Sequence, residues 1–182
     1  HAIPVAVGAE SAMREETLAR ECPSDLKIKV ADVSLASEAD AKAAMDIAVA
    51  AQDQWRTTPL RQRAELLEKL ADSLQEDRDI LSAIMIFESA KTWREADADV
   101  AEAVDCCRYY ARLALEELGP KKLGTLAGED NRLFYEGRGP SVVIAPWNFP
   151  LAILCGMATA SLVAGNPTLM KPAEQSSAIA YA

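Results

Sequence analysis

Apolar and polar residues between positions 37 and 118 recur at steps of three and four, the spacing of amphipathic helices. The pattern predicts four consecutive helices that begin near Ser37, Pro59, Arg78 and Trp93. Gly119-Pro120 ends the last one, because glycine commonly terminates helices and proline cannot continue them. Four helices ahead of any strong strand indicate a layer that covers a sheet.

Two of these helix starts carry capping signals. Ser37 is followed three residues later by Asp40, which is the spacing of a capping box. Thr58-Pro59 predicts an N-cap threonine with proline at the first helical position. The third and fourth helices are expected at Arg78–Ser89 and Trp93–Leu118.

Strand signals are weak before the helices and strong after them. Within residues 1–35 only Ile28–Val33 has the alternation of a short strand. The glycine-rich and charged segment Lys121–Gly139 is interpreted as a hairpin-like excursion, with a strand-like piece at Arg132–Glu136.

The last 45 residues predict the order strand, loop, helix, strand, loop, helix. Short apolar strands are expected at Ser141–Ala145 and Thr168–Met170, with a buried helix at Leu151–Ala164 between them and a second helix from Gln175. A connection of this length implies parallel strands and a right-handed crossover. The predicted fold class is therefore α/β, in which ligands bind beyond the carboxyl ends of the strands.

Composition narrows the possible partners. The 182 residues carry a net charge of −9, which argues against nucleic acid and anionic membranes because both attract basic surfaces. No apolar run reaches the roughly 18 residues that cross a bilayer, and no signal peptide is evident. The four cysteines have no zinc or redox spacing, so we expect a reduced, cytoplasmic protein.

The only histidine is His1. A Ser-His-Asp or Cys-His site built within the chain is therefore excluded, and we expect no metal site. Glu95, Asp97, Asp99 and Glu102 lack the glycine and glutamate spacing of a calcium loop. A solvated helix face is the interpretation adopted for Glu95 and Asp99.

Two loops follow the predicted strands and carry candidate chemistry. In the first, the amide of Asn148 stands between Trp147 and Phe149 on a loop stiffened by two prolines. Such an amide can donate to a developing oxyanion, a role worth about 3 kcal/mol. The alternative is that Asn148 hydrogen-bonds its own loop.

In the second loop, Lys171 offers donors and Glu174 acceptors, a pair suited to the vicinal hydroxyls of a ribose. The alternative is a solvated Lys171 and a Glu174 placed in the first turn of a helix, where the dipole favours it. Neither glycine-rich phosphate-binding motif occurs in the chain. Cys106, Cys107 and Cys155 lie in predicted helices without a neighbouring base, so none is expected to be a nucleophile.

Three motifs at these positions resemble the aldehyde dehydrogenase superfamily. They are Val142-Val-Ile-Ala-Pro-Trp-Asn-Phe-Pro150, Leu162-Val-Ala-Gly-Asn166 and Met170-Lys-Pro-Ala-Glu-Gln175, in the family's order and spacing. The segments Lys91–Asp105 and Gly128–Asn131 are similar to the branch of Δ1-pyrroline-5-carboxylate dehydrogenases, some of which are fused to proline dehydrogenase. This branch oxidises L-glutamate γ-semialdehyde to glutamate with NAD in proline catabolism.

The resemblance implies roles for individual residues. Asn148 matches the oxyanion-hole amide, and Lys171 with Glu174 matches the pair that holds the adenosine ribose. The cofactor-lining strand end is matched by Ile144, Ala145, Pro146 and Trp147, and the substrate pocket by Glu102 and Phe149. Glu174 favours NAD over NADP, since a carboxylate repels a 2′-phosphate.

The resemblance also implies an architecture. Residues 1–182 would form the N-terminal part of a Rossmann-type NAD-binding domain preceded by a helical layer, interrupted at about residues 121–139 by part of an oligomerisation hairpin. The family's nucleophilic cysteine, general-base glutamate and phosphate-facing helix are expected beyond Ala182, in a catalytic domain absent here. We therefore expect residues 1–182 alone to be inactive and to self-associate or bind the missing half.

Three departures from the family pattern stand out. Ala90 occupies a position where glycine is usual, Cys106 one where the branch has phenylalanine, and Pro167 one where threonine is common. Two alternatives also remain. One is an aldehyde dehydrogenase of other specificity, and the other is a non-catalytic remnant that keeps only the fold or an assembly surface.

Overall fold

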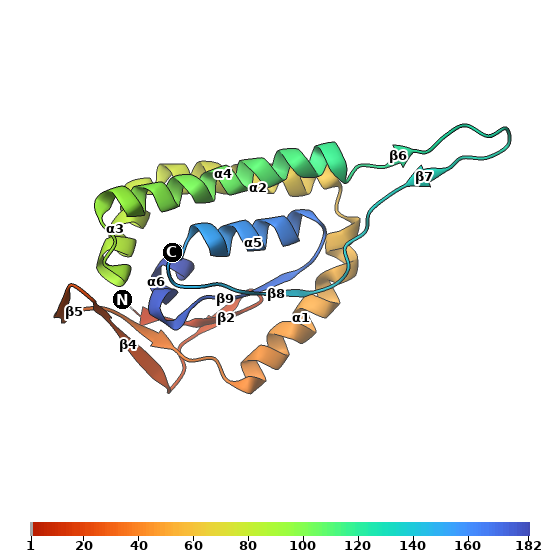
Figure 1. Ribbon diagram of the computed structural model, residues 1–182. Coiled ribbons are helices and arrows are strands. Elements are labelled where there is room, and N and C mark those ends of the chain that lie inside the picture. Colours follow the sequence, from red (N-terminus) through yellow and green to blue (C-terminus); the bar gives the residue numbers. More distant parts are fainter. Residues whose placement is uncertain (1) are drawn as a thin grey trace.

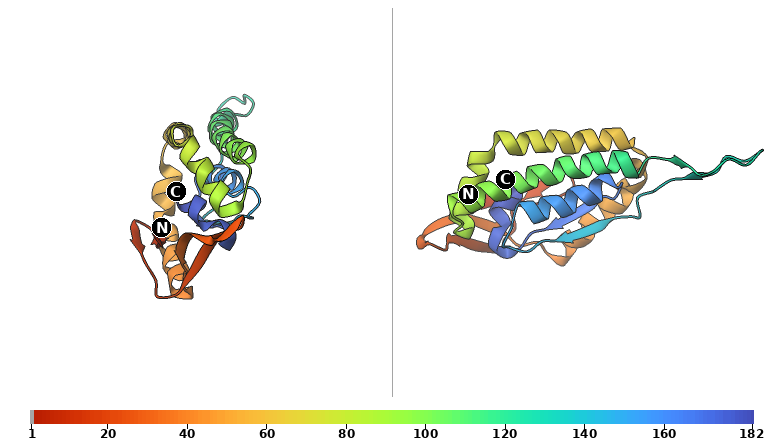
Figure 2. Two further views of the ribbon diagram at one scale, coloured as in Figure 1. Left: turned by 90° about the vertical axis from the view of Figure 1, so that its left-hand side faces the viewer. Right: turned by 45° about the horizontal axis from the view of Figure 1, so that its top comes forward.

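The computed structural model describes residues 2–182, so His1 lies outside the described part. Figure 1 shows α2 and α4 side by side, α5 beneath them, and the parallel strands β8 and β9 beneath α5, and the views of Figure 2 agree. The helices are α1 Glu38–Thr57, α2 Leu60–Glu76, α3 Arg78–Ser89, α4 Trp93–Glu117, α5 Ala152–Val163, the short 3₁₀ helix η1 Glu174–Ser176 and α6 Ser177–Tyr181. The four predicted helices are confirmed, but they do not form one layer: α2, α3 and α4 pack together, whereas α1 packs against β2 and β9.

The capping box predicted at the start of α1 is confirmed. The Ser37 hydroxyl accepts a hydrogen bond from the Asp40 N–H at 3.2 Å, and the Asp40 carboxylate accepts one from the Ser37 N–H at 2.9 Å. Thr92 and Glu95 form a second capping box at the start of α4. These reciprocal bonds satisfy N–H groups that no helical carbonyl can reach.

The predicted start of α2 is wrong by one residue. Pro59 is the N-cap, and its carbonyl accepts from the N–H of Arg63 at 3.1 Å. Thr58 instead ends α1, and its hydroxyl donates to the Gln54 carbonyl at 2.9 Å. The proline ring disfavours a helical conformation at the residue before it, so α1 stops at that point.

The N-terminal segment contains more strands than the sequence predicted. The predicted strand at Ile28–Val33 is part of a longer one, β5, which pairs in parallel with β1 and antiparallel with β4. The additional strands are β1 Ala2–Ile3, β2 Val5–Val7, β3 Glu10–Ala12 and β4 Thr17–Cys22, and β5 itself spans Asp25–Ser34. Most of their side chains are exposed, so they lack the apolar alternation by which strands are recognised in a sequence.

The predicted strand–helix–strand unit is confirmed as β8 Ser141–Ile144, α5 and β9 Thr168–Lys171. The two strands are parallel, with Ser141 opposite Thr168 and Ile144 opposite Lys171. The α/β fold class is thereby confirmed.

The core lies between the helical layer and this unit. Small buried residues of α4 face α5, and a Cβ on Gly156 would meet the Cys106 sulfur at 3.1 Å. Close helix packing therefore depends on small side chains at this interface. The buried apolar residues of the largest cluster are Leu81, Met85, Ala96, Val100, Ala103, Leu151, Ala152 and Ile179.

The excursion is a two-stranded hairpin that projects away from the body (Figure 1). Its strands are β6 Lys121–Lys122 and β7 Arg132–Leu133, paired antiparallel. The strand predicted at Arg132–Glu136 is therefore shorter than expected. We call this projecting hairpin, residues 121–135, the arm. Its exposed apolar side chains are Leu123, Leu126, Leu133, Phe134 and Tyr135.

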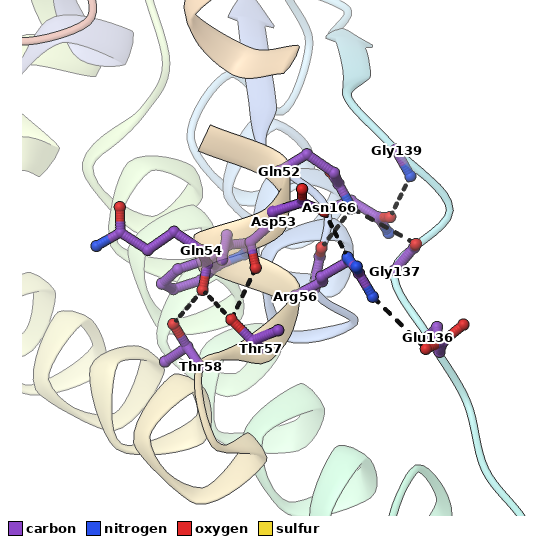
Figure 3. Close-up of polar contacts among 12 residues, drawn as sticks. Gln52, Asp53, Gln54, Arg56, Thr57, Thr58, Glu136, Gly137, Gly139 and Asn166 are labelled. Atoms are coloured by element: carbon purple, nitrogen blue, oxygen red, sulfur yellow. Dashed lines mark hydrogen bonds and ion pairs between the residues drawn. The ribbon is translucent and has the colours of Figure 1, made fainter. Parts of the chain in front are cut away.

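The chain returns from the hairpin through residues 136–139, which contact the end of α1, as Figure 3 shows. The Gln52 amide donates to the carbonyls of Gly137 and Gly165 at 3.5 and 3.4 Å. The Gly139 N–H donates to the Asn166 side-chain carbonyl at 3.1 Å. These bonds set where β8 and β9 begin, at the end of the sheet opposite the candidate site.

None of the helices in the described residues is long and apolar enough to span a membrane.

Gly137→Ala should lower the free energy of unfolding by about 2 kcal/mol, because overpacking distorts the backbone. A Cβ at this position would lie 2.1 Å from the Gly165 carbonyl oxygen, which belongs to the main chain and cannot rotate away. Urea denaturation measures the change. Gly119→Ala is the control, since its Cβ would lie 3.8 Å from the nearest neighbouring atom, the Leu115 oxygen. Equal midpoints for the two variants would contradict this account.

Candidate functional site

The two candidate loops lie next to each other. Ile144 and Lys171 are the last residues of β8 and β9 and are register partners. Just beyond them, the Ala145 N–H donates to the Lys171 carbonyl at 3.2 Å. The loops at residues 145–150 and 172–176 therefore leave the same edge of the sheet, where α/β proteins bind ligands.

Asn148 lies at the exposed tip of the first loop. Its neighbours Trp147 and Phe149 are 59% and 42% exposed, whereas Pro150 is buried. Within residues 2–182 the Asn148 side chain makes no hydrogen bond. The alternative in which Asn148 bonds its own loop is thus not what the structure shows, and both amide hydrogens remain free to donate.

A shallow cleft of about 340 Å³ lies between this loop and the turn that joins α3 to α4. Its lining residues are Ser89, Ala90, Lys91, Glu95, Ala98, Trp147, Asn148 and Phe149. Asn148 and Phe149 both line the cleft, and the roles expected for them stay predictions. A hollow of about 440 Å³ on the outer face of α2 and α4 lies away from the strand ends.

The expectation that Asp99 is solvated is wrong. Its side chain is completely buried and accepts a hydrogen bond from the Ala152 N–H at 2.8 Å. Lys91 pairs with it at 2.9 Å and is itself only 11% exposed. The helical spacing could have indicated this burial, because Asp99 lies three residues after Ala96 and four before Ala103, on the buried face of α4. Glu95 is exposed, as expected.

Glu88, which the sequence did not single out, is a second buried carboxylate. It accepts hydrogen bonds from the N–H groups of Ala178 and Ile179 at 2.7 and 2.9 Å. Burial raises the pKa of Glu88, and these hydrogen bonds offset part of that effect. Its position seven residues after Leu81 and three after Met85, on the buried face of α3, was the available signal.

Lys171 and Glu174 lie at the second loop, and both are exposed. No hydrogen bond or ion pair joins them in the described residues. The Glu174 carboxylate accepts from the Gln175 amide at 3.2 Å and opens η1, so it occupies a first helical turn. Their placement suits a ribose, and this role stays a prediction.

Glu102 is exposed on α4, one turn beyond Ala98. It does not line the cleft, so the structure leaves its predicted substrate contact as a prediction. The thiols of Cys107 and Cys155 lie 3.4 Å apart between α4 and α5. Hydrogen bonding to Cys107 and burial raise the pKa of Cys155, which agrees with a core role.

The structure explains why glycine is usual in the family at the position of Ala90. Ala90 ends α3 in the left-handed region, with φ of 53°. Glycine adopts this conformation without the steric cost that a Cβ brings. This backbone conformation therefore favours glycine. Ala90, which lines the cleft, adopts it with some backbone strain.

The parallel β8–α5–β9 unit, with polar loops at its carboxyl edge, is typical of α/β proteins that bind a ligand beyond the strand ends. The aldehyde dehydrogenase family model matches residues 10–182, and the chain belongs to that family.

Among curated relatives, 1-pyrroline-5-carboxylate dehydrogenase of Staphylococcus epidermidis is 38% identical over 179 residues, and that of Anoxybacillus flavithermus is 39% identical over 178. Each comparison covers 98% of this chain and 35% of the relative. The chain thus spans about a third of the length of the relatives it matches.

Solved structures of the same family also match nearly the whole of this chain and only part of their own length. Proline utilization A from Bdellovibrio bacteriovorus, inactivated by N-propargylglycine, superposes with a TM-score of 0.97 at 42% identity, covering 100% of this chain and 19% of that one. A Thermus 1-pyrroline-5-carboxylate dehydrogenase with bound NAD superposes with a TM-score of 0.93 at 37% identity, covering 98% and 35%.

Glu88 should make stability fall as pH rises. Its folded pKa lies above the unfolded value of 4.5, so between those two values the native state holds more protons than the unfolded state. Its contribution is therefore complete below pH 4.5 and is lost as pH rises through the folded pKa. Glu88→Gln should remove this slope from melting temperatures measured between pH 2 and 8.

Glu95 supplies the opposite-sign control for that experiment. Hydrogen bonds from the Thr92 N–H and hydroxyl lower the pKa of Glu95. Its stabilisation is present above its unfolded pKa and is lost as pH falls through the folded pKa. If Glu88→Gln and Glu95→Gln changed the pH slope in the same direction, the assignment to Glu88 would be overturned.

Proposed function

We propose that the full-length protein containing this chain is an NAD-dependent dehydrogenase that oxidises L-glutamate γ-semialdehyde to glutamate. The observation that carries the proposal is the free Asn148 amide in the loop after β8, at the same edge of the sheet as Lys171 and Glu174. The names of relatives that are 36–42% identical over nearly the whole chain support the substrate.

The residues present fit the adenosine half of NAD. Lys171 and Glu174 are exposed at the sheet edge, and the Gln175 amide donates to the Glu174 carboxylate and so restrains it. An ammonium and a carboxylate complement the donors and acceptors of vicinal ribose hydroxyls. The strand end from Ile144 to Trp147 would line the same cofactor, which when bound accepts the hydride of the aldehyde carbon.

Asn148 would stabilise negative charge on the aldehyde oxygen. When a nucleophile adds to the carbonyl carbon, that oxygen gains charge, and a fixed amide N–H within hydrogen-bond distance lowers the barrier. The free amide hydrogens of Asn148 meet the chemical requirement. Phe149 and the cleft beside it would contact the carbon chain of the substrate, with Glu102 further along α4.

The arm formed by β6 and β7 would serve assembly. It projects from the body and exposes Leu126, Phe134 and Tyr135, which a monomer would leave in water (Figure 1). We propose that it pairs with another subunit, and that residues 1–182 form the N-terminal part of a cytoplasmic enzyme's NAD-binding domain. Free thiols at all four cysteines are compatible with that compartment.

The proposal is tested by assaying the purified full-length protein on a panel of aldehydes with NAD or NADP. We expect the highest kcat/KM for glutamate semialdehyde, and a preference for NAD because the Glu174 carboxylate repels a 2′-phosphate. Faster oxidation of simple aliphatic or aromatic aldehydes would assign a different specificity. No oxidation of any aldehyde would favour a non-catalytic role.

Asn148→Ala in the full-length protein should lower kcat by about a hundred- to a thousandfold, the usual cost of removing one oxyanion donor. Asn148→Asp should be at least as damaging, since it places a negative charge beside the developing oxyanion. The dissociation constant for NAD should change little in both variants. A raised KM with an unchanged kcat would instead assign Asn148 to ground-state substrate binding.

A further inference from the structure

The loop that carries Asn148 is held by a residue from another layer of the fold. Helix α5 starts at Ala152, four residues after Asn148. Its N-cap, Leu151, offers no side-chain hydrogen bond, and its first turn contains no acidic residue. The buried Asp99 carboxylate of α4 caps it instead, through the Ala152 N–H at 2.8 Å.

The same carboxylate also acts on the residue next to Asn148, through Lys91. The Lys91 ammonium lies 2.9 Å from Asp99 and 4.5 Å from the centroid of the Phe149 ring. A cation at that distance from a ring face is attracted to it, more strongly where water is excluded. Asp99 fixes the ammonium, and the ammonium fixes the aromatic neighbour of Asn148.

We propose that Asp99 is a positioning residue that, together with Lys91, holds Asn148 in its donating geometry; the proposal rests on the function proposed above. Among residues 2–182 the Asn148 side chain has no hydrogen bond to fix it, so its position depends on the backbone around it. Asp99 acts at two points of the segment that follows Asn148, at Phe149 through Lys91 and at Ala152 directly. Misplacement of a catalytic group by about 1 Å can cost a hundredfold in rate.

Asp99→Asn in the full-length protein is the direct test. The amide keeps an acceptor for the Ala152 N–H but removes the charge that holds Lys91. We expect kcat for aldehyde oxidation to fall about ten- to hundredfold, while the dissociation constant for NAD changes much less, because Lys171 and Glu174 lie on the other loop and Trp147 is the one proposed cofactor contact in the segment that Asp99 holds. An unchanged kcat would overturn the proposal.

Asp97→Asn is the matched control. Asp97 lies two residues earlier on α4 and pairs with Arg78 at 2.8 Å, but this pair is partly exposed and touches neither loop. The control therefore removes an aspartate from the same helix and from a similar ion pair. We expect its kcat to stay within about twofold of the wild type, and an equal loss in both variants would overturn the proposal.

A double-variant cycle separates positioning from general damage. If Asp99 acts through Asn148, Asp99→Asn should lower kcat little further once Asn148→Ala is present, because interacting residues are non-additive. Additive losses would overturn the proposal. If Asp99→Asn does not fold, Lys91→Gln replaces it in the cycle, since that change keeps the bond from Ala152 to Asp99, and the same criterion applies.

Amide hydrogen exchange supplies a readout that does not need activity. Exchange at residues 147–153 should accelerate in Asp99→Asn and not in Asp97→Asn. Wild-type protein that oxidises no aldehyde would refute the proposed function alone, because the exchange comparison would still show whether Asp99 orders the loop. Unchanged exchange at these residues would overturn the positioning role, whatever the activity.

Discussion

Both ends of α5 are held by charges that the helix does not itself carry. Its sequence has no charged residue, and neither its first nor its last turn is complemented from within. The Asp99 carboxylate of α4 accepts from its first N–H, and the Arg63 guanidinium of α2 donates to the Val163 carbonyl at 3.0 Å. A negative charge at the amino end and a positive charge at the carboxyl end both interact favourably with the helix dipole and stabilise α5. The helical layer and the sheet are thereby joined by polar bonds as well as by apolar packing.

This arrangement sets the geometry of both ends of the β8–α5–β9 unit. At the carboxyl edge, Asp99 and Glu88 accept from the first turns of the helices that follow β8 and β9. At the opposite end, Arg63 also donates to the carbonyls of Trp55 and Arg56, where α1 ends. A buried charge that loses its partner costs several kcal/mol, so these contacts tolerate little change in helix position. The candidate loops inherit their positions from residues far away in sequence.

The elements that local sequence signals predicted are those whose signals are complete within a few residues. The capping box at Ser37 and the apolar strands around Val143 and Leu169 are of this kind, and so are the loops that carry Asn148 and Lys171. Strands β1 to β4 were missed because their side chains are mostly exposed, and β1 in addition pairs with a distant segment, Asp32–Val33 of β5. Asp99 and Glu88 were missed because a carboxylate in a helix is ordinarily solvated, and only the stripe of buried neighbours distinguishes them.

A free amide at Asn148 is useful only if other residues hold it still. Hydrogen bonds to its own loop would fix the side chain but would use the hydrogens that an oxyanion requires. Here the backbone on either side is fixed instead, by the prolines that flank the loop, by the Lys91 ammonium over Phe149 and by Asp99 at Ala152. Apolar packing could fill the same space, but it would offer no partner for the buried Ala152 N–H. A buried ion pair that adds little net stability can therefore be explained by the geometry it imposes on this loop.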